Sequence, residues 1–348
     1  MTEPETVPRS RPPRKPSIAD VAADAGVSGQ TVSRVAQGLS NVEAGTRDRV
    51  LASMRKLGYR PNRAAQALRS GRFRNIGVIM FTLSSFGNMR TLDAIASSAA
   101  RARYSITLIP VETPTQKDVS VAFSQLQDQA VDGIIIVIEA HIIDQADVVL
   151  PPGLPVVVID SSVRADYPMV DADQAQGARL ATQHLLDLGH ETVWHVAGPE
   201  SSYSAVRRET AWRETLLAAG RTPPPVTRGD WSTSSGYQAG VEMARMPGIT
   251  AIFAANDQMA LGVLRALHES GRAVPADVSV VGFDDMAESD SFWPPLTTIH
   301  QDFDAVGRRS IELLVAEIES GDIDPLGAVI PTRLVVREST GAPPRITG

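Results

Sequence analysis

A helical stretch near the N-terminus presents side chains that could hydrogen-bond to the edges of DNA bases. Val32 and Val35 fall on one face of a short helix that would follow Ser28. The opposite face contains Gly29, Gln30, Ser33, Arg34 and Gln37. Gln and Arg pair bidentately with adenine and guanine in the major groove. The pattern therefore predicts a helix that recognises a DNA sequence.

The neighbouring residues predict the helices that would position this face. Ser17, with Asp20 three residues later, can cap a first helix. Gly26 suits the left-handed turn that ends it, and Ser28 can cap the second helix. A third helix is expected at residues 44–57, and the apolar positions of all three would form a small core. These core positions are Ile18, Val21, Ala22, Ala25, Val27, Val32, Val35, Val50, Met54 and Leu57. The spacing is typical of a helix-turn-helix motif.

A weaker helix is expected directly after this region. Pro61 and Asn62 precede residues 63–70, a stretch rich in good helix formers. So short a helix is marginal in water, and it should form only with a partner that offsets its ordering entropy. A disordered linker is the alternative interpretation.

The distribution of charge also sets the N-terminal region apart. Residues 1–74 contain 14 Lys and Arg against 6 Asp and Glu, whereas the remainder contains 19 against 34. A basic head on an acidic body favours a polyanionic partner at the head alone, and a solvated basic tail is the alternative explanation. The chain has no cysteine, no apolar run long enough to span a membrane and no secretory signal. A cytoplasmic location without membrane contact is therefore expected.

From residue 76 onward, short apolar runs alternate with helical stretches. The expected strands are residues 76–81, 106–111, 133–138, 155–159, 193–197, 250–254 and 278–282. Such alternation predicts an α/β fold of doubly wound parallel sheets. The stretch is too long for one sheet, so two lobes with a cleft between them are expected. Ligands bind beyond the carboxyl ends of strands in such folds.

Ordered motifs along the chain resemble the LacI/GalR family of transcriptional regulators. In the head they are AGVS at 25–28, TVSRV at 31–35 and GYRPNRAA at 58–65. In the core they are AGPESSYSA at 197–205, GDWS at 229–232, ANDQMALG at 255–262, SVVGFDD at 279–285 and PPLTTIHQDF at 294–303. The resemblance covers almost the whole chain after its tail. It implies a helix-turn-helix domain, a hinge helix and a two-lobed core similar to periplasmic binding proteins.

The resemblance also implies a set of domain boundaries. A disordered basic tail is expected at residues 1–16, the DNA-binding domain at 17–60, the hinge helix and linker at 61–74, the sugar-binding core at 75–341 and a second tail at 342–348. Within the core, the first lobe is expected at residues 75–172 and 302–331, and the second at 173–301 and 332–341.

DNA contacts are implied for residues of the head and the hinge. They are Ser28, Gly29, Gln30, Thr31, Ser33, Arg34, Asn62, Arg63, Gln66 and Leu68. The family pattern implies that two Leu68 side chains, one per subunit, wedge into the minor groove and kink the operator. Gly29 departs from the pattern, in which a tyrosine is expected. We therefore expect an operator sequence that is related to the operators of the family but differs from them.

A ligand pocket is implied in the core. Its expected residues are Asp160, Ser204, Arg208, Trp231, Asn256, Asp284, Gln301 and Phe303. These residue types suit a sugar, because Arg208 and Asp284 can pair with vicinal hydroxyls, Asn256 can donate and accept, and Trp231 can stack on a C–H face. Taken singly, the tryptophan could equally be a core residue, and Asp284 with Asp285 could form a turn.

Other positions around the expected ligand depart from the family pattern. Val137 stands where an asparagine is expected, Thr113 stands where an arginine is expected, and residues 84–90 are also dissimilar. The side that holds the sugar ring is therefore expected to be kept, while the side that faces an aglycone or second ring should differ. A galactoside is favoured as the ligand.

Together these features predict a repressor of carbohydrate-utilisation genes that a sugar inducer releases from a pseudo-palindromic DNA operator. A regulator that binds DNA better with ligand is the alternative within the family. A sugar-binding transport protein would share the core but would not explain the head. An enzyme is disfavoured because the histidines have no metal-ligand spacing and no phosphate loop or serine elbow is present. Paired Asp284 and Asp285 would be its best catalytic candidates, and no cofactor or metal is expected.

The oligomeric state follows from the expected operator. Two heads must match two half-sites, so a homodimer formed through helical faces of the first lobe is expected. The chain ends in GAPPRITG, which contains no heptad repeat. This ending favours a dimer over a tetramer.

Overall fold

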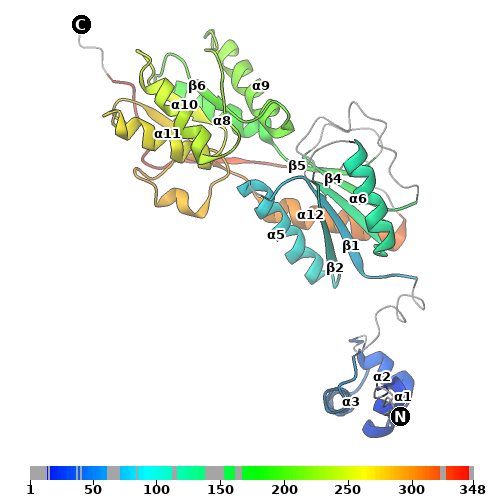
Figure 1. The fold of residues 1–348 in the computed structure, drawn as a ribbon. Coiled ribbons are helices and arrows are strands. Elements are labelled where there is room, and N and C mark those ends of the chain that lie inside the picture. The colour runs from blue at the N-terminus through cyan, green and yellow to red at the C-terminus, as the bar shows by residue number, and fades with distance from the viewer. Residues whose placement is uncertain are drawn as a thin grey trace, which may run out of the picture. The chain divides into compact units, whose positions relative to one another are not determined.

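The computed structural model describes residue 14 and residues 16–36, 38–39, 41–60, 71–83, 85–111, 116–137, 153–160, 167–321 and 327–344. Contacts divide the chain into two units, residues 1–73 and 74–348, and each is described by itself (Figure 1). The expected hinge helix at residues 63–70 lies outside the described residues, as do most of the two expected tails.

The first unit contains the three helices that the sequence predicts. α1 (Ile18–Ala25) begins with a capping box, in which the Asp20 carboxylate accepts a hydrogen bond of 2.7 Å from the backbone N–H of Ser17. α1 ends at Gly26, whose φ of 65° is left-handed. α2 (Gly29–Ala36) and α3 (Ala44–Leu57) follow. Their buried core consists of Val21, Val32, Val35, Val50 and Met54.

The first lobe of the second unit is a parallel sheet covered on both faces. Its strand order is β11-β5-β4-β3-β1-β2. The strands are β1 (Asn75–Met80), β2 (Ser105–Pro110), β3 (Gly133–Val137), β4 (Val156–Ile159), β5 (Met169–Ala172) and β11 (Ala328–Ile330). α5 (Phe86–Arg101) and α12 (Phe303–Ser320) pack on one face, and α6 (Gln116–Asp128) packs on the other.

The second lobe repeats this layering around a smaller parallel sheet. Its strand order is β7-β6-β8-β9, formed by β6 (Trp194–Ala197), β7 (Thr227–Arg228), β8 (Ala251–Ala254) and β9 (Ser279–Val281). α8 (Gln174–Asp187) and α9 (Tyr203–Ala218) cover one face, and α10 (Thr233–Ala244) and α11 (Asp257–Glu269) cover the other. A short 3₁₀ helix, η1 (Ala287–Asp290), follows β9.

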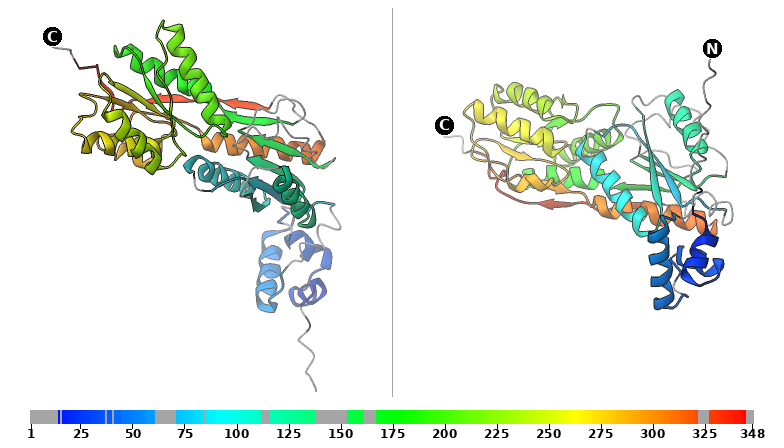
Figure 2. Two further views of the ribbon diagram at one scale, coloured as in Figure 1. Left: turned by 45° about the horizontal axis from the view of Figure 1, so that its top comes forward. Right: turned by 60° about the horizontal axis from the view of Figure 1, so that its bottom comes forward.

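The chain passes between the lobes at three places within the described residues. It crosses between β5 and α8, between β10 (Thr298–His300) and α12, and between β11 and β12 (Arg333–Val335). β10 and β12 pair antiparallel next to the second lobe's sheet. Figure 2 shows the two lobes side by side with these crossing segments between them. Residues at the crossings are therefore placed to contact both lobes.

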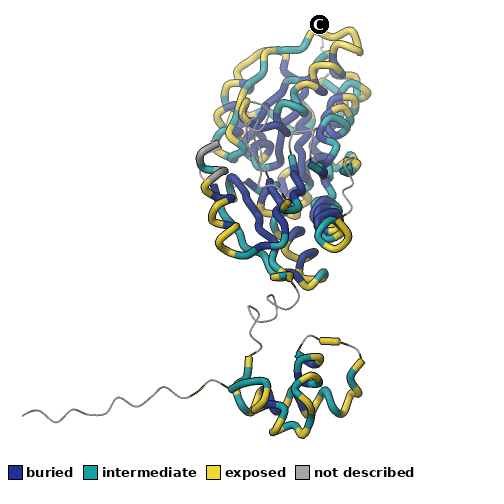
Figure 3. Tube along the Cα trace, turned by 90° about the vertical axis from the view of Figure 1, so that its right-hand side faces the viewer, coloured by how far each residue is buried: buried dark blue, intermediate teal, exposed yellow. Residues whose placement is uncertain are grey.

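The predicted α/β fold with doubly wound parallel sheets is confirmed. Each of the strands expected from an apolar run is present, with ends that differ by at most one residue. The apolar runs do not predict β5, β7, β10, β11 or β12, because these strands are only two to four residues long and all of them except β11 contain polar residues. Buried residues lie in the interior of the second unit, and exposed residues lie on its outer turns (Figure 3).

Candidate ligand pocket and DNA-recognition helix

A pocket between the two lobes brings together all of the ligand residues proposed from the sequence. It is lined by Asp160, Ser204, Arg208, Trp231, Asn256, Asp284, Gln301 and Phe303. Further lining residues include Ser85, Asn88, Val137, Asp171 and Gln174. The pocket is open to solvent, and its empty space with the mouth included is about 590 Å³. The geometry therefore permits these side chains to act on one ligand.

The side chains from the second lobe lie where strands end and helices begin. Ser204 and Arg208 belong to the first two turns of α9, which follows β6. Asn256 caps α11 directly after β8, and Asp284 follows β9. The carboxyl ends of neighbouring parallel strands meet at one edge of a sheet. Segments far apart in sequence are gathered there for this reason.

Three pocket residues have a left-handed backbone, although none is glycine. The φ angles are 58° for Asp160, 72° for Trp231 and 110° for Asp284. Such conformations cost about 1–3 kcal/mol each and persist where the surrounding structure enforces them, often at binding sites. Their grouping around one pocket supports a role in binding for this part of the fold.

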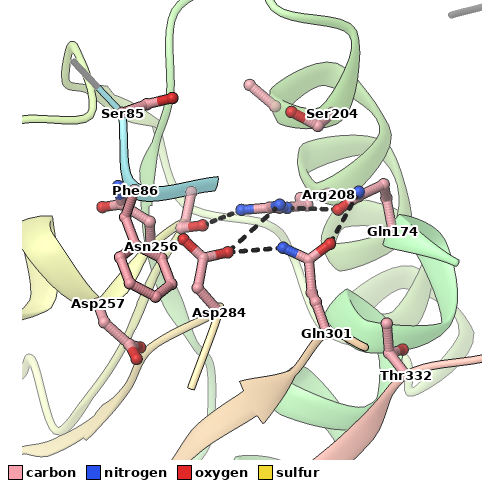
Figure 4. A network of polar contacts seen from close by, with 12 residues as sticks. Ser85, Phe86, Gln174, Ser204, Arg208, Asn256, Asp257, Asp284, Gln301 and Thr332 are labelled. Carbon is pink, nitrogen blue, oxygen red and sulfur yellow. Dashed lines mark hydrogen bonds and ion pairs between the residues drawn. The ribbon is translucent and has the colours of Figure 1, made fainter. Parts of the chain in front are cut away.

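Four side chains form a closed ring of polar contacts along one side of the pocket. Arg208 Nε donates to Gln174 Oε1 at 2.8 Å, and Gln174 Nε2 donates to Gln301 Oε1 at 3.1 Å. Gln301 Nε2 donates to Asp284 Oδ1 at 2.7 Å, and that oxygen lies 3.7 Å from Arg208 Nη2 (Figure 4). The ring includes residues from two of the crossings. It therefore couples the position of the Arg208–Asp284 pair to the connection between the lobes.

Aromatic rings and a backbone carbonyl hold the guanidinium further. Arg208 Cζ lies 3.7 Å from the ring centroid of Phe283 and 5.5 Å from that of Trp231. Its Nη1 donates to the carbonyl of Ala255. The side chains of Arg208 and Asp284 are each only 5% exposed. Cation–π contacts strengthen in such desolvated surroundings, so the pair is fixed before any ligand enters.

Burial changes the acidity of the carboxylates in this region. It raises the pKa of Asp284 to about 6, although the Arg208 guanidinium and the Gln301 amide favour the ionised form. It also raises the pKa of Asp171 to about 6, against a hydrogen bond from the Gln174 side chain. Both groups consequently titrate closer to neutrality than an exposed aspartate does.

A neighbouring buried carboxylate, that of Asp257, braces the loop after β9. It accepts hydrogen bonds from Thr298 Oγ1 at 2.5 Å, Ser289 Oγ at 2.7 Å and the backbone N–H of Met286 at 2.9 Å. Burial, with repulsion from Asp284, raises the pKa of Asp257 to about 7. Asp257 lies outside the pocket lining, so its contribution is to position the segment that contains Asp284.

Asn256 serves the fold as well as lining the pocket. Its Oδ1 accepts the backbone N–H of Met259 at 2.8 Å, and its Nδ2 donates to the carbonyl of Trp231 at 3.1 Å. These bonds cap α11 and tether the strained tryptophan. An amide has a second N–H and a second lone pair, so the proposed contact of Asn256 with a ligand is compatible with both structural bonds.

The first-lobe side of the pocket consists of strand ends and helix starts. Val137 ends β3, Asp160 follows β4 and Asp171 lies within β5. Phe303 begins α12, with its ring edge-on to Phe86 at a centroid distance of 6.0 Å. Val137 lies in the lining, where the departure from the family pattern was expected to matter. Thr113, the other departing position, lies outside the described residues.

Two further pocket residues, Asp171 and Gln174, were not identified from the sequence. Asp171 is 5% exposed and Gln174 is equally buried. The signal that could have found them is the sequence DADQ at residues 171–174. It directly follows the apolar residues Met169 and Val170, where the chain leaves the first sheet. The short length of β5 hides this signal from strand prediction.

The predicted DNA contacts of the head divide into described and undescribed residues. Ser28 caps α2, accepting the backbone N–H of Thr31 at 3.2 Å. Gln30 and Arg34 are exposed and lie one turn apart on α2, on one face, with the less exposed Ser33 beside them. The other expected contacts, Asn62, Arg63, Gln66 and Leu68, lie outside the described residues.

Gly29 leaves space on the recognition helix. A Cβ added there would lie 3.4 Å from Ile18 Cγ2, an ordinary van der Waals distance, and the residue does not require a left-handed backbone. The fold therefore does not demand glycine at this position. The missing side chain is consistent with a difference in operator preference.

Two other kinds of site have no candidate in the part of the chain that the structure describes. No group of three or more His, Cys, Asp or Glu residues there could hold a metal ion. No helix there is long and apolar enough to cross a membrane.

A helix-turn-helix head and a two-lobed core with a polar pocket define the class of ligand-responsive DNA-binding regulators. Residues 17–62 match the bacterial regulatory proteins of the lacI family, and residues 182–340 match the periplasmic binding protein-like domain. The chain is 38% identical over 333 residues to the lactose operon repressor of Escherichia coli K12, covering 94% of this chain and 91% of the repressor. The chain belongs to the LacI family.

Solved structures agree with this assignment. The lac repressor dimer bound to operator and the anti-inducer ONPF has a TM-score of 0.84 and 37% identity, with 94% of this chain and 100% of that chain covered. The complex of the transcriptional regulator CelR with cellobiose has a TM-score of 0.70 and 31% identity, with 93% and 99% covered. These relatives are regulators, which confirms the predicted class and the expectation that the chain is not an enzyme.

Proposed function

We propose that this protein represses carbohydrate-utilisation genes and that a sugar inducer, favoured to be a galactoside, releases it from its operator. The observation that carries the proposal is the ring of Arg208, Gln174, Gln301 and Asp284 in a pocket between lobes, in a chain that also has a DNA-recognition helix. The relative solved as a dimer on operator DNA supports a homodimer on a pseudo-palindromic site. Such a protein acts in the cytoplasm, where its operator is.

The chemistry of the second-lobe side supports a sugar. A guanidinium and a carboxylate held side by side can exchange paired hydrogen bonds with vicinal hydroxyls. Trp231 supplies an aromatic surface beside them, and Arg208 and Asp284 are themselves buried. The similarity to the lactose operon repressor favours a galactoside. A cello-oligosaccharide is the second candidate, since a relative was solved with cellobiose.

The proposed switch uses the connection between the lobes. A sugar that prefers the closed arrangement of the lobes would disfavour the arrangement in which two hinge segments fold together on DNA. To shift nearly all of the protein molecules from one arrangement to the other, the sugar would need about a 10⁴-fold higher affinity for the favoured state, about 5.5 kcal/mol. A smaller difference in affinity suffices for partial regulation. A sugar that prefers the DNA-bound state would instead make the protein a corepressor-type regulator.

Operator selection with the full-length protein tests the proposal. Binding sites would be enriched from random DNA at physiological salt, and affinity for the selected site would be measured with and without a galactoside such as isopropyl β-thiogalactoside, and with cellobiose. We expect a pseudo-palindromic site and weaker binding with the inducer. Absence of any sequence preference would contradict DNA recognition. Tighter binding with sugar would support the corepressor alternative.

The proposed dimer has a separate test. Sedimentation at micromolar concentration should give the mass of two protomers, because two heads match the two half-sites of a pseudo-palindromic operator and a relative was solved as a dimer on its operator. A mass of four protomers would contradict this expectation.

A further inference from the structure

A buried carboxylate on the first-lobe side of the pocket has no part in the ring described above. Asp171 is 5% exposed and lines the same pocket as Asp160 and Asp284. In β5 its neighbours Val170 and Ala172 belong to the core beneath α5 and α12. Side chains alternate along a strand, so Asp171 is directed away from that core. An acidic group at this place is not required to complete the core.

Asp171 is connected to the ring without belonging to it. The Gln174 side chain favours the ionised form of the Asp171 carboxylate, while Gln174 also donates to Gln301 and accepts from Arg208. An ionised carboxylate can accept about four hydrogen bonds. The oxygens of Asp171 therefore have capacity for donors from a molecule in the pocket.

The charges along the lining are unequal. Among the described lining residues, the carboxylates are those of Asp160, Asp171 and Asp284, and Arg208 supplies the cationic group. Arg207, the next cation on α9, favours the ionised form of Asp171 through its charge, but it donates to the hydroxyl of Tyr203 at 2.9 Å and does not line the pocket. Carboxylates in confined, water-poor surroundings repel an anion more strongly than they would in water.

We infer that Asp171 is a ligand-contacting specificity residue, which makes the pocket reject anionic sugars and accept sugars that present hydroxyl or ammonium donors to the first lobe. This inference rests on the proposed function, since it assumes that the pocket binds a sugar. It adds the classes of sugar that the pocket should not bind, which are uronic acids and sugar phosphates.

A charge series of one sugar tests the inference with the full-length protein. Calorimetry would compare methyl β-galactoside, its 6-amino-6-deoxy form and its uronate, and the same three forms of methyl β-glucoside. We expect the uronate to bind at least tenfold more weakly than the neutral parent, and the amine to bind at least as well. In Asp171→Asn, the ratio of neutral to anionic affinity should fall at least threefold, because removal of the charge relieves the repulsion of the anionic form while the neutral form loses only an acceptor.

A matched control separates charge at the pocket from charge elsewhere. Asp128→Asn removes the same charge from an exposed position at the end of α6 in the same lobe, and it should leave the ratio unchanged. Equal binding of the neutral and anionic forms by the wild-type protein would overturn the inference. So would a uniform loss of affinity for all three forms in Asp171→Asn, which is the effect of a residue that only braces Gln174. Failure of both neutral parents to bind would instead overturn the sugar-binding proposal, and the inference with it.

Discussion

The two sides of the pocket are built in different ways. The second-lobe side is cross-braced, since Arg208 and Asp284 are joined through Gln174 and Gln301 and packed against Phe283. The first-lobe side is a row of strand ends and helix starts. One of its polar groups, the Asn88 amide, donates to the Thr82 carbonyl of the same lobe at 2.9 Å.

Because of this difference, the two sides of the pocket can have separate roles in ligand binding. A braced guanidinium–carboxylate pair offers the same geometry to any ligand that presents suitable hydroxyls, because little reorganisation accompanies binding. Side chains at strand ends can be substituted with little effect on the rest of the lobe, so ligand specificity can be altered there. We therefore expect substitutions on the second-lobe side to abolish ligand binding and substitutions on the first-lobe side to change ligand preference.

The largest expected effect is that of Arg208→Ala, which removes the centre of the braced side. It leaves the buried Asp284 carboxylate without its guanidinium, and such changes at buried, charge-assisted contacts remove about 3 kcal/mol or more. Sugar affinity measured by calorimetry should fall at least about 100-fold, while operator affinity in the absence of sugar is kept. Arg207→Ala is the matched control, because Arg207 is bonded to Tyr203 outside the ring. If Arg208→Ala unfolds the protein, the residue is structural and its assignment to the ligand is wrong.

The stability of the second-lobe core beneath the braced side should depend on pH through His195. This imidazole is fully buried between the rings of Trp212 and Phe253, at centroid distances of 5.2 and 4.7 Å. Burial lowers the pKa of His195 to about 4, against a hydrogen bond to the Phe253 carbonyl. The unfolded chain therefore binds a proton before the folded one does. The stability that the neutral form provides is present above pH 6.5 and is lost as pH falls toward 4.

His195→Phe isolates this contribution, because it keeps the aromatic stack and removes the titration. Other groups titrate equally in both proteins, so the difference between their unfolding free energies is informative. Between pH 7 and pH 5 that difference should change by about 2 kcal/mol in favour of the variant, as measured by denaturant unfolding. A constant difference for His195→Phe would mean that His195 is protonated in the folded state.

The sequence predicts the two sides of the pocket unequally. Val- and Ile-rich runs give β1, β3 and β4 because these strands are buried on both faces. The motifs around Arg208 and Asp284 are ordered and specific, so the braced side could be proposed by resemblance. Asp171 could not be found in this way, since its significance depends on Gln174 and on groups far along the chain. Only the folded crossing from β5 to α8 brings these groups together.

One carboxylate on each side of the pocket has a raised pKa. Burial raises the pKa of both Asp284 and Asp171 to about 6. A sugar hydroxyl donates to the ionised form, so affinity should be greatest above pH 7 and be lost as pH falls through 6. Each carboxylate that must be ionised weakens binding about tenfold at pH 5. Calorimetry from pH 5 to 8 should show this loss, and Asp284→Asn and Asp171→Asn should each make the profile flatter. A flat wild-type profile would show that neither carboxylate accepts a bond from the ligand.

The smallest expected effect tests whether the first-lobe side sets preference. Val137 ends β3 in the pocket lining and is only 2% exposed. Val137→Asn introduces an amide that can bond to a polar substituent but is costly to bury beside an apolar one. Affinity for lactose relative to isopropyl β-thiogalactoside should therefore rise about threefold, roughly half of the 1.4 kcal/mol that a tenfold change represents. The control is Ile135→Val, which lies two residues earlier in the same strand and belongs to the core rather than to the pocket lining. An equal change in affinity for both sugars would mean that this position affects the stability of the closed lobes and not the choice of ligand.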